Sequence, residues 1–142
     1  MKQELVGNIV FDTGPVLELL YSTVRGAKIK AALTAEELRG NISDITVAEL
    51  RYVLCRKLGH EESRTKINSL LESRYLAVHE ASKLVETAAE YKCRRNLSLA
   101  DCFALALAKT IGAPVLFAKK EEDLVREMSK EPLDVEIRFL QQ

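Results

Sequence analysis

Three acidic residues of this sequence, Asp12, Glu49 and Asp101, stand where a folded chain can gather side chains for metal chemistry. Asp12 ends a short apolar run, residues 9–11, which predicts a buried strand, and the Gly14-Pro15 pair after it predicts a sharp break into a helix. Glu49 and Asp101 each fall in the first turn of a predicted helix. Because the carboxyl ends of parallel strands and the amino ends of the returning helices share one edge of a sheet, we expect the three carboxylates to meet there. The arrangement suggests a metal site.

Two further acids, Glu121 and Asp123, follow a later predicted strand and belong to the same edge. Carboxylates gathered in this way repel one another unless protons or a cation neutralise them. Oxygen ligands suit Mg²⁺ or Mn²⁺, with water completing the coordination. Such an ion activates a water molecule and stabilises the charge that builds on a phosphate. The chemistry that these acids imply is therefore phosphodiester hydrolysis.

The two helical acids also have a purely structural interpretation. Residues 46–49 read Thr-Val-Ala-Glu, a capping box in which Glu49 reaches back to the amide of Thr46. Residues 98–101 read Ser-Leu-Ala-Asp and fit the related start signal, with Asp101 in the capping position. Taken singly, each residue suits a helix cap better than a metal ligand.

The remaining acids have structural interpretations too. Asp12 alone is typical of a turn, and the acidic residues 121–123 favour the positive end of a helix. What favours a metal site is the joint placement of all these acids on one edge. The same helix amino ends carry positive dipole character, which helps to hold a carboxylate cluster or a phosphate.

Hydrophobic periodicity predicts strands that alternate with helices along the whole chain. Strands are expected over residues 6–12, 41–45, 76–78, 114–117 and 135–139, and helices over 15–22, 25–39, 46–58, 61–73, 80–95, 98–111 and 121–129. The helix at 98–111 is apolar almost all round, so it should pack on more than one side. This order implies an α/β fold with a parallel sheet covered on both faces, and residues 1–142 are expected to form a single domain.

The composition limits where the protein works and how it binds. With 47% hydrophobic and 30% charged residues among 142, the chain is typical of a globular protein. The 21 basic and 21 acidic residues cancel, so nucleic-acid binding requires a local patch. No apolar stretch is long enough for a membrane span, and no signal peptide is apparent. Three cysteines lack metal-ligand spacing, and their odd number argues against a disulfide framework, so we expect a cytoplasmic protein.

Three short blocks resemble the acidic motifs of PIN-domain proteins. The blocks are residues 11–14 (Phe-Asp-Thr-Gly), 46–50 (Thr-Val-Ala-Glu-Leu) and 97–102 (Leu-Ser-Leu-Ala-Asp-Cys). Their spacing and the length of the chain are similar to those of the small single-domain members, especially the VapC-type toxins of prokaryotic toxin–antitoxin pairs. The resemblance covers nearly the whole chain.

The resemblance implies a PIN-like, three-layer α/β/α sandwich with a central, mostly parallel sheet of four to five strands. It implies a Mg²⁺- or Mn²⁺-dependent endoribonuclease in which Asp12, Glu49 and Asp101 are catalytic metal ligands. It also implies that the hydroxyl of Thr13 holds the side chain of Asp12. Similar proteins are homodimers into whose groove an antitoxin inserts a segment, so the implied partners are an RNA substrate, an antitoxin and a second copy of the chain.

The fourth acidic block departs from the family pattern. Family members carry Thr, Asp and a second Asp after the fourth strand, whereas here Lys119 takes the Thr place, Glu121 the first Asp place and Asp123 the second. By this correspondence Glu121 is a fourth catalytic and metal-binding residue and Asp123 a further ligand. Because Glu121 is longer by one methylene, a second metal would bind there more weakly or through water. Lys119 either pairs with the acids or contacts a phosphate.

Basic residues lie near the same predicted edge. Arg94 and Arg95 precede the helix at 98–111, and Lys119 and Lys120 follow the strand at 114–117. All four are candidates for contacts with RNA phosphates, which position a nucleic acid without reading its sequence. The alternative is that they are solvated residues at helix ends.

Three functions compete for these residues. The first is metal-dependent RNA cleavage by the toxin of a VapBC-type pair. The second is a degenerate PIN-like module that binds RNA or a protein without cutting, which the altered fourth block favours. The third is an aspartyl-phosphate phosphohydrolase, since Asp12 follows a first strand. Those enzymes carry a second aspartate two residues further on, where this chain has Gly14, so we set that function aside.

Overall fold

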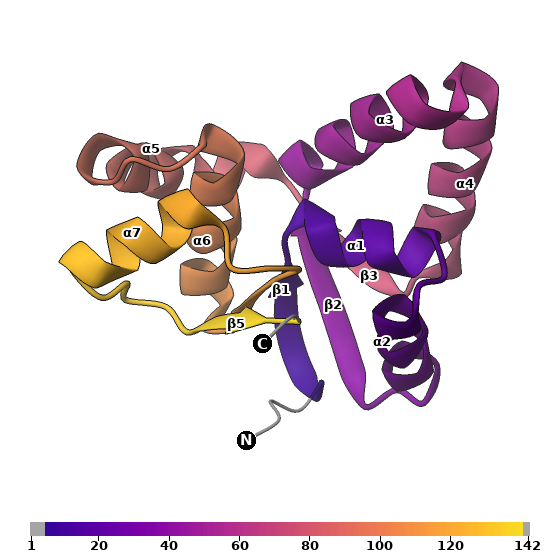
Figure 1. Cartoon of the computed structure of the whole chain (residues 1–142), viewed down its shortest axis with the longest axis horizontal. Coiled ribbons are helices and arrows are strands. Elements are labelled where there is room, and N and C mark those ends of the chain that lie inside the picture. Colours follow the sequence, from indigo (N-terminus) through magenta and orange to yellow (C-terminus); the bar gives the residue numbers. More distant parts are fainter. Residues whose placement is uncertain (1–4, 141–142) are drawn as a thin grey trace.

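The computed structural model describes residues 5–140 of the chain, and strands alternate with helices throughout (Figure 1). The strands are β1 (Gly7–Phe11), β2 (Leu38–Ser43), β3 (Leu76–His79), β4 (Val115–Phe117) and β5 (Ile137–Phe139). The helices are α1 (Thr13–Leu20), α2 (Val24–Thr34), α3 (Asp44–Leu58), α4 (His60–Ser73), α5 (Val85–Arg94), α6 (Leu99–Ile111) and α7 (Glu122–Lys130), with a 3₁₀ helix η1 (Ala81–Leu84) before α5. The structure therefore divides the predicted helix at 80–95 into a 3₁₀ turn and α5.

The five strands within residues 5–140 form one sheet in the order β3-β2-β1-β4-β5, and every neighbouring pair is parallel. The predicted α/β class and three-layer sandwich are confirmed, and the sheet is parallel throughout rather than mostly so. Because all the strands run in one direction, their carboxyl ends lie along one edge. This is the edge at which the acidic residues were predicted to meet.

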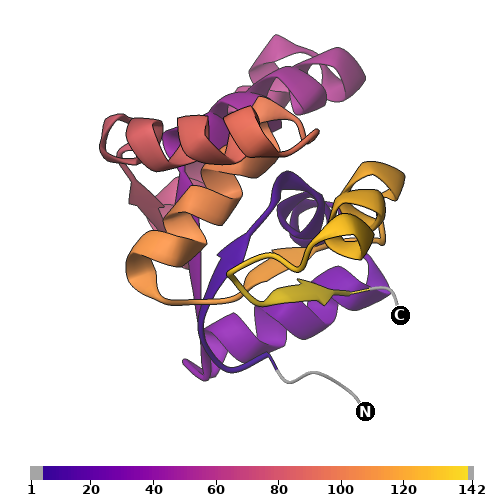
Figure 2. The same cartoon turned by 90° about the vertical axis from the view of Figure 1, so that its left-hand side faces the viewer.

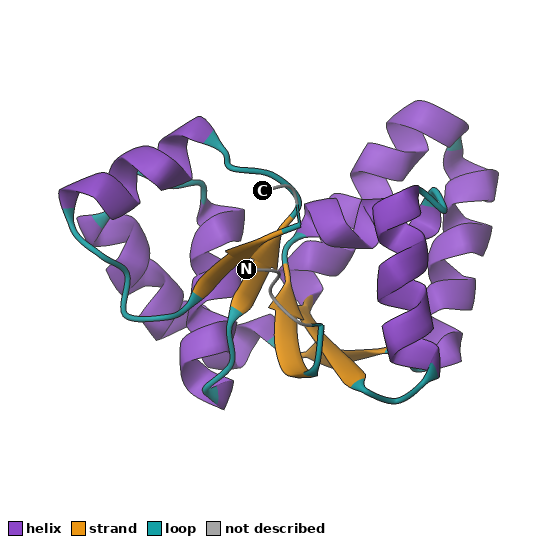
Figure 3. Ribbon diagram, turned by 60° about the horizontal axis from the view of Figure 1, so that its bottom comes forward, coloured by secondary structure: helices purple, strands orange, loops and turns teal. Residues whose placement is uncertain are grey.

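Helices cover both faces of the sheet (Figure 3). Side chains alternate along a strand, so Ile9 and Phe11 of β1 join a core made with α1 to α4, whereas Val10 joins a second core made with α5, α6 and α7. Figure 1 shows these two groups of helices on opposite sides of β1, and Figure 2 shows the molecule from the side of α5 to α7. β1 thus lies between two hydrophobic cores, which fix the position of the residues that follow it.

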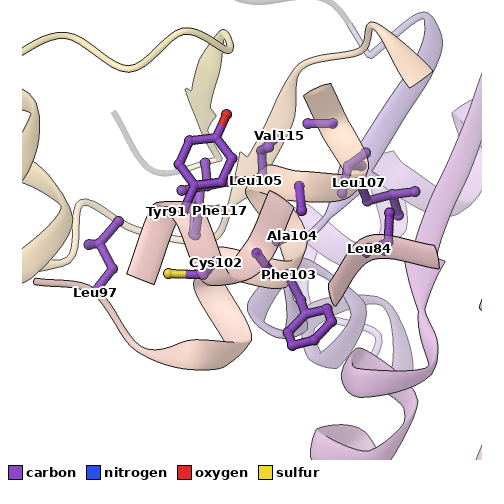
Figure 4. Close-up of a cluster of buried hydrophobic side chains, with 14 of the residues drawn as sticks. Leu84, Tyr91, Leu97, Cys102, Phe103, Ala104, Leu105, Leu107, Val115 and Phe117 are labelled. Carbon is purple, nitrogen blue, oxygen red and sulfur yellow. The ribbon is translucent and has the colours of Figure 1, made fainter. Parts of the chain in front are cut away.

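Helix α6 is buried over a continuous run, Asp101–Ala108. It packs against α5, α3 and the strands β1, β2 and β4. Figure 4 shows Cys102 and Leu105 of this helix in the cluster that also contains Val115 and Phe117. The prediction that this helix packs on more than one side is confirmed. As a consequence, the amino end of α6 is held rigidly at the edge of the sheet.

Strand β2 differs from its predicted limits. It begins at Leu38 rather than at residue 41, and the preceding helix ends at Thr34 rather than at residue 39. Leu38 is buried at 2% exposure, but the Arg-Gly-Asn sequence at 39–41 lacks the alternation that marks a strand. A Cβ on Gly40 would lie 2.3 Å from the side chain of Leu76, so the close fit against β3 explains the glycine. No helix in the part of the chain that the structure describes has both the length and the apolar character to cross a bilayer.

Candidate active site

Asp12 lies directly after β1, at the carboxyl edge of the sheet. Its backbone amide donates a hydrogen bond to the carbonyl of Leu116 on β4 (3.0 Å), which holds the residue in line with the strand. Asp12 is only 8% exposed. It occupies the N-cap position of α1, but among the described residues its carboxylate makes no capping hydrogen bond. Helix capping therefore does not account for this buried carboxylate.

Asp101 lies in the first turn of α6, as predicted. The cap of this helix is Ser98, whose hydroxyl accepts a hydrogen bond from the backbone amide of Asp101 (3.1 Å). Ser98 and Asp101 thus form the predicted helix-start pair, and the carboxyl group of Asp101 also interacts with the side chain of Ser98. Asp101 is 9% exposed and lies beside Asp12, since the charge of Asp101 raises the pKa of Asp12 and the two side chains interact.

Glu49 lies one turn further into its helix than predicted, because α3 begins at Asp44 and not at Thr46. The hydroxyl of Ser43 caps the helix by accepting a hydrogen bond from the amide of Ile45 (3.2 Å). The capping-box interpretation of residues 46–49 is therefore wrong. The strand before α3 runs further than its polar sequence suggested, and its last residue supplies the cap.

The carboxylate of Glu49 instead accepts a hydrogen bond of 2.5 Å from the hydroxyl of Thr13. The expectation that this hydroxyl holds Asp12 needs correction, because Asp12 interacts with the backbone amide of Thr13 rather than with its side chain. Thr13 is 8% exposed, so the bond to Glu49 is sheltered from water. The segment after β1 thus supplies Asp12 itself and, through Thr13, a hydrogen bond to Glu49.

Glu121 follows β4 and occupies the N-cap position of α7. Its charge acts on both Asp12 and Asp101, so it belongs to the same group of acids. Asp123 is different: its side chain is 68% exposed and pairs with Arg126 on the surface of α7 (3.4 Å). The structure thus brings four of the five predicted acids together and places Asp123 at the surface.

Burial is the main cause that raises the pKa of Asp12 well above its ordinary value. The negative charges of Asp101, Glu121 and Glu49 raise it further, and together they outweigh the opposing hydrogen bond from the amide of Thr13. A carboxyl group with a raised pKa retains its proton at a higher pH than usual. The site therefore resists carrying its full negative charge.

The pKa values of the neighbouring acids shift in the same direction. Burial and then the charge of Glu121 raise the pKa of Asp101 to about 6, against the effect of a hydrogen bond with Ser98. Burial also raises the pKa of Glu121, which the positive charge of Lys119 partly offsets. Burial and like charges thus disfavour the ionised forms of Asp12, Asp101 and Glu121, and a cation would relieve this repulsion.

The donor set suits a hard divalent cation, since it consists of carboxylate oxygens. Among residues 5–140, no three His, Cys, Asp or Glu side chains are already arranged as a complete ligand set. Mg²⁺ commonly keeps several water molecules and uses only one or two carboxylates directly. The carboxylate chemistry of these residues is therefore compatible with a hydrated Mg²⁺ or Mn²⁺ ion.

The predicted basic residues differ in their surroundings. Arg94, Lys119 and Lys120 are exposed. The guanidinium group of Arg95 instead donates hydrogen bonds to three backbone carbonyls at the end of α7, those of Glu127 (3.0 Å), Glu131 (2.7 Å) and Pro132 (3.0 Å). With a side chain only 10% exposed, Arg95 is occupied in fixing α7.

Sequence reasoning did not single out Glu127, the buried partner of Arg95. Glu127 is 4% exposed, and its carboxylate lies 3.9 Å from the guanidinium of Arg95 and 3.2 Å from the ammonium of Lys130. Burial acts to raise the pKa of Glu127, but its hydrogen bonds with Lys130 and the Asn96 amide, together with these positive charges, lower it overall. Nothing in the sequence distinguishes Glu127, a buried partner of Arg95, from the other charged residues of its helix.

The comparisons with known proteins agree with this arrangement. The sequence model of the family described as the PIN domain matches residues 9–127, which include all four clustered acids. Comparison with the curated proteins finds no match.

Several solved structures share the fold at low sequence identity. VapBC2 from Rickettsia felis, bound to a promoter DNA fragment, superposes with a TM-score of 0.71 at 14% identity, covering 94% of this chain and 98% of that one. VapBC-1 from nontypeable Haemophilus influenzae gives 0.67 at 20% identity, with the same two coverages of 94% and 98%. VapC20 from Mycobacterium tuberculosis, described as a Sarcin-Ricin loop cleaving toxin, gives 0.65 at 20% identity and covers 83% of this chain and 94% of that one.

Proposed function

Because this chain belongs to the PIN domain family, we propose that it is a divalent-metal-dependent endoribonuclease that hydrolyses phosphodiester bonds of RNA. One observation carries the proposal: Asp12, Glu49, Asp101 and Glu121 come from four separate elements at the carboxyl edge of the sheet, where burial and like charges raise the pKa values of Asp12, Asp101 and Glu121. Structural acids are normally paired with cations or helix amides. Here the largest cause of each shift is burial, and like charges add to it.

In this proposal Asp12 and Asp101 are the direct ligands of a Mg²⁺ or Mn²⁺ ion, because they are the most buried of the four acids, and Glu49 and Glu121 complete the site. The bound ion would activate water and neutralise the charge that develops on the phosphate. Thr13 keeps the carboxylate of Glu49 in a fixed orientation through its 2.5 Å hydrogen bond. Because the pKa values of Asp12, Asp101 and Glu121 are raised, protons would compete with the cation for these carboxylates, so binding is expected to weaken as the pH falls.

The substrate part of the proposal draws on surface charge and on the relatives. Arg94, Lys119 and Lys120 are exposed and close in sequence to the elements that bear Asp101 and Glu121, so we assign them contacts with RNA phosphates. The Mycobacterium tuberculosis relative is described as a Sarcin-Ricin loop cleaving toxin. We therefore choose structured RNA as the first substrate to test. Arg95 is left out of this set because its guanidinium group already binds the end of α7.

The biological role that we propose is that of a toxin in a toxin–antitoxin pair, acting in the cytoplasm as a homodimer. The relatives from Rickettsia felis and Haemophilus influenzae are VapBC structures. An antitoxin encoded beside this chain is therefore the protein partner we expect.

The second candidate is a PIN-like module that binds RNA or a protein partner without cleaving. The specific observation in its favour is Lys119, which takes the position of the family's Thr in the fourth block. Its positive charge acts on Glu121. If the ammonium group takes the place of a cation, the domain would bind Mn²⁺ feebly. It would also lose little stability in a chelator.

Incubation of the purified protein with Mn²⁺ and a structured RNA separates the two candidates. We expect cleavage that stops when a chelator is added and that the double variant Asp12→Asn, Asp101→Asn abolishes. Glu122→Gln is the matched control, because Glu122 is an exposed acid of the same segment as Glu121. This variant should cleave RNA as the unaltered protein does. Cleavage that survives the double substitution would rule out the acidic cluster as the active site.

A further inference from the structure

Gly14 lies in the first turn of α1, between the segment that carries Asp12 and the body of the helix. Its φ angle is not among the positive values found at Gly7, Gly59 and Gly112, so its backbone conformation does not call for glycine. Glycine within a helix is less favourable than alanine because it restricts more backbone freedom on folding. A different reason for glycine at this position must therefore exist.

The surroundings of Gly14 supply that reason. A Cβ on this residue would lie 2.7 Å from the Cβ of Ala118, and 3.5 Å and 3.7 Å from its backbone nitrogen and Cα. The Cβ of an alanine has no rotamer that would move it away. The first turn of α1 and the segment after β4 therefore touch directly, and a single methyl group fills the space between them.

These two segments are the ones that carry acids of the proposed site. Asp12 and Thr13 precede Gly14, and Glu121 follows Ala118 by three residues. The last register pair between β1 and β4 joins Phe11 to Leu116, one residue before Asp12. The amide of Asp12 also bonds to the carbonyl of Leu116. Beyond these ties, the contact between Gly14 and Ala118 limits how closely the two acidic segments approach.

We propose that Gly14 and Ala118 are positioning residues that set the separation of Asp12 from Glu121, and through it the affinity of the site for a divalent cation. The inference rests on the proposed function, because it assumes that these acids bind a cation. Neither residue contributes a ligand. Each acts through the acid in its own segment.

The contact predicts the results of exchanging one methyl group across it. Gly14→Ala places two methyl groups where one fits and pushes the segments apart. We therefore expect Mn²⁺ affinity to fall by about tenfold or more, as changes in residues that position metal ligands typically cause. Ala118→Gly leaves a gap and loosens the contact, with an expected loss of about threefold. The double variant Gly14→Ala, Ala118→Gly moves the methyl group to the other side of the contact and should recover affinity to within about twofold of the unaltered protein.

Calorimetric titration of Mn²⁺ into the metal-free proteins tests the inference, with circular dichroism as the check that each variant is folded. Recovery in the double variant supports it. Equal affinity of Gly14→Ala and the unaltered protein overturns it, as does a double variant no better than Gly14→Ala. If Gly14→Ala does not fold, Ala118→Gly decides alone, since it adds no bulk: a weakened affinity supports the inference and an unchanged one overturns it. Failure of the unaltered protein to bind Mn²⁺ is a separate result that overturns the proposed function and the inference together.

Discussion

The hydroxyl of Thr13 donates a 2.5 Å hydrogen bond to the carboxylate of Glu49, and this bond links the first turn of α1 to the second turn of α3. The two helices leave neighbouring parallel strands, so the bond spans the edge of the sheet between β1 and β2. Through this bond Thr13, the residue after Asp12, orients the carboxylate of Glu49. Thr13 therefore has a measurable role in the site although it is not itself expected to bind the metal.

Replacement of Thr13 by valine keeps the shape of the side chain and removes the donor. A hydrogen bond to a charged group contributes about 1.5–3 kcal/mol, so we expect Mn²⁺ affinity to fall by about tenfold or more when Glu49 loses its partner. Thr13→Ser retains the hydroxyl and should bind Mn²⁺ nearly as tightly as the unaltered protein. Calorimetry on the two variants makes the comparison, and a valine variant with unaltered affinity would show that the bond has no part in metal binding.

The raised pKa of Asp101 predicts how the stability of the metal-free protein depends on pH. Because burial and the charge of Glu121 raise the pKa from 3.8 in the unfolded chain to about 6, the favourable contribution is complete below pH 3.8 and is lost as the pH rises through 6. Asn at this position cannot ionise. Asp101→Asn should therefore be more stable than the unaltered protein at pH 7.5 in chelator, by roughly 1–3 kcal/mol, since one pKa unit corresponds to about 1.4 kcal/mol.

Urea denaturation from pH 4 to 7.5 measures this difference in the free energy of unfolding. The difference between Asp101→Asn and the unaltered protein should grow with pH, whereas Glu122→Gln, an exposed control, should differ little at any pH. Added Mn²⁺ should stabilise the unaltered protein and not Asp101→Asn. A difference in unfolding free energy that is the same at pH 4 and pH 7.5 would contradict the raised pKa of Asp101.

Arg95 and Arg94 are adjacent, and the structure predicts opposite results for them. Arg95→Met removes three hydrogen bonds from the end of α7 and leaves the buried carboxylate of Glu127 with fewer partners, so the thermal midpoint should fall clearly. Arg94→Met should leave the midpoint nearly unchanged, because Arg94 is exposed, and should instead weaken binding to RNA. Adding Glu127→Gln to Arg95→Met should recover part of the loss. Equal midpoints for the two arginine variants would refute the role assigned to Arg95.

Lys119 provides a test of the altered fourth block. Its positive charge acts on Glu121, so it competes with a cation for the same carboxylate. Lys119→Thr should therefore tighten Mn²⁺ binding, by up to about fivefold, because an exposed charge interaction contributes about 0.2–1 kcal/mol. Lys120→Thr, the neighbouring exposed lysine, should leave Mn²⁺ affinity unchanged. Weaker binding by Lys119→Thr would mean that the ammonium group supports the site instead of opposing the cation.

The fold was predictable wherever local signals agreed with the tertiary structure. α6 has an apolar run, a Ser98 cap and a Gly112 that ends the helix in the left-handed conformation, and its limits were nearly correct. The start of β2 at Leu38 was missed because residues 39–41 lack the alternation of a strand, although Asn41 is buried. Its side-chain amide bonds to the carbonyl of Ile9 (3.3 Å), and its oxygen lies 2.9 Å from His79. Those partners come from other strands, so no local pattern marks them.

The gathering of the acids followed from chain direction alone, since each lies at a strand end or near a helix start. The exact partners did not follow. The bond from Thr13 to Glu49 depends on the distance between α1 and α3, and Arg95 turns toward backbone carbonyls that any sequence would present. Asp123 suited the family pattern as well as Glu121 did, but the rotation of α7 directs it to the surface. That the four acids bind a metal stays a prediction.

A crystal structure of the protein soaked in Mn²⁺ tests the central claim most directly, because anomalous scattering locates the ion independently of the protein atoms. The account predicts one anomalous peak at the carboxyl edge of the sheet, between the carboxylates of Asp12 and Asp101 and within reach of Glu49 and Glu121. Ordered carboxylates with no peak between them at a saturating Mn²⁺ concentration would contradict it.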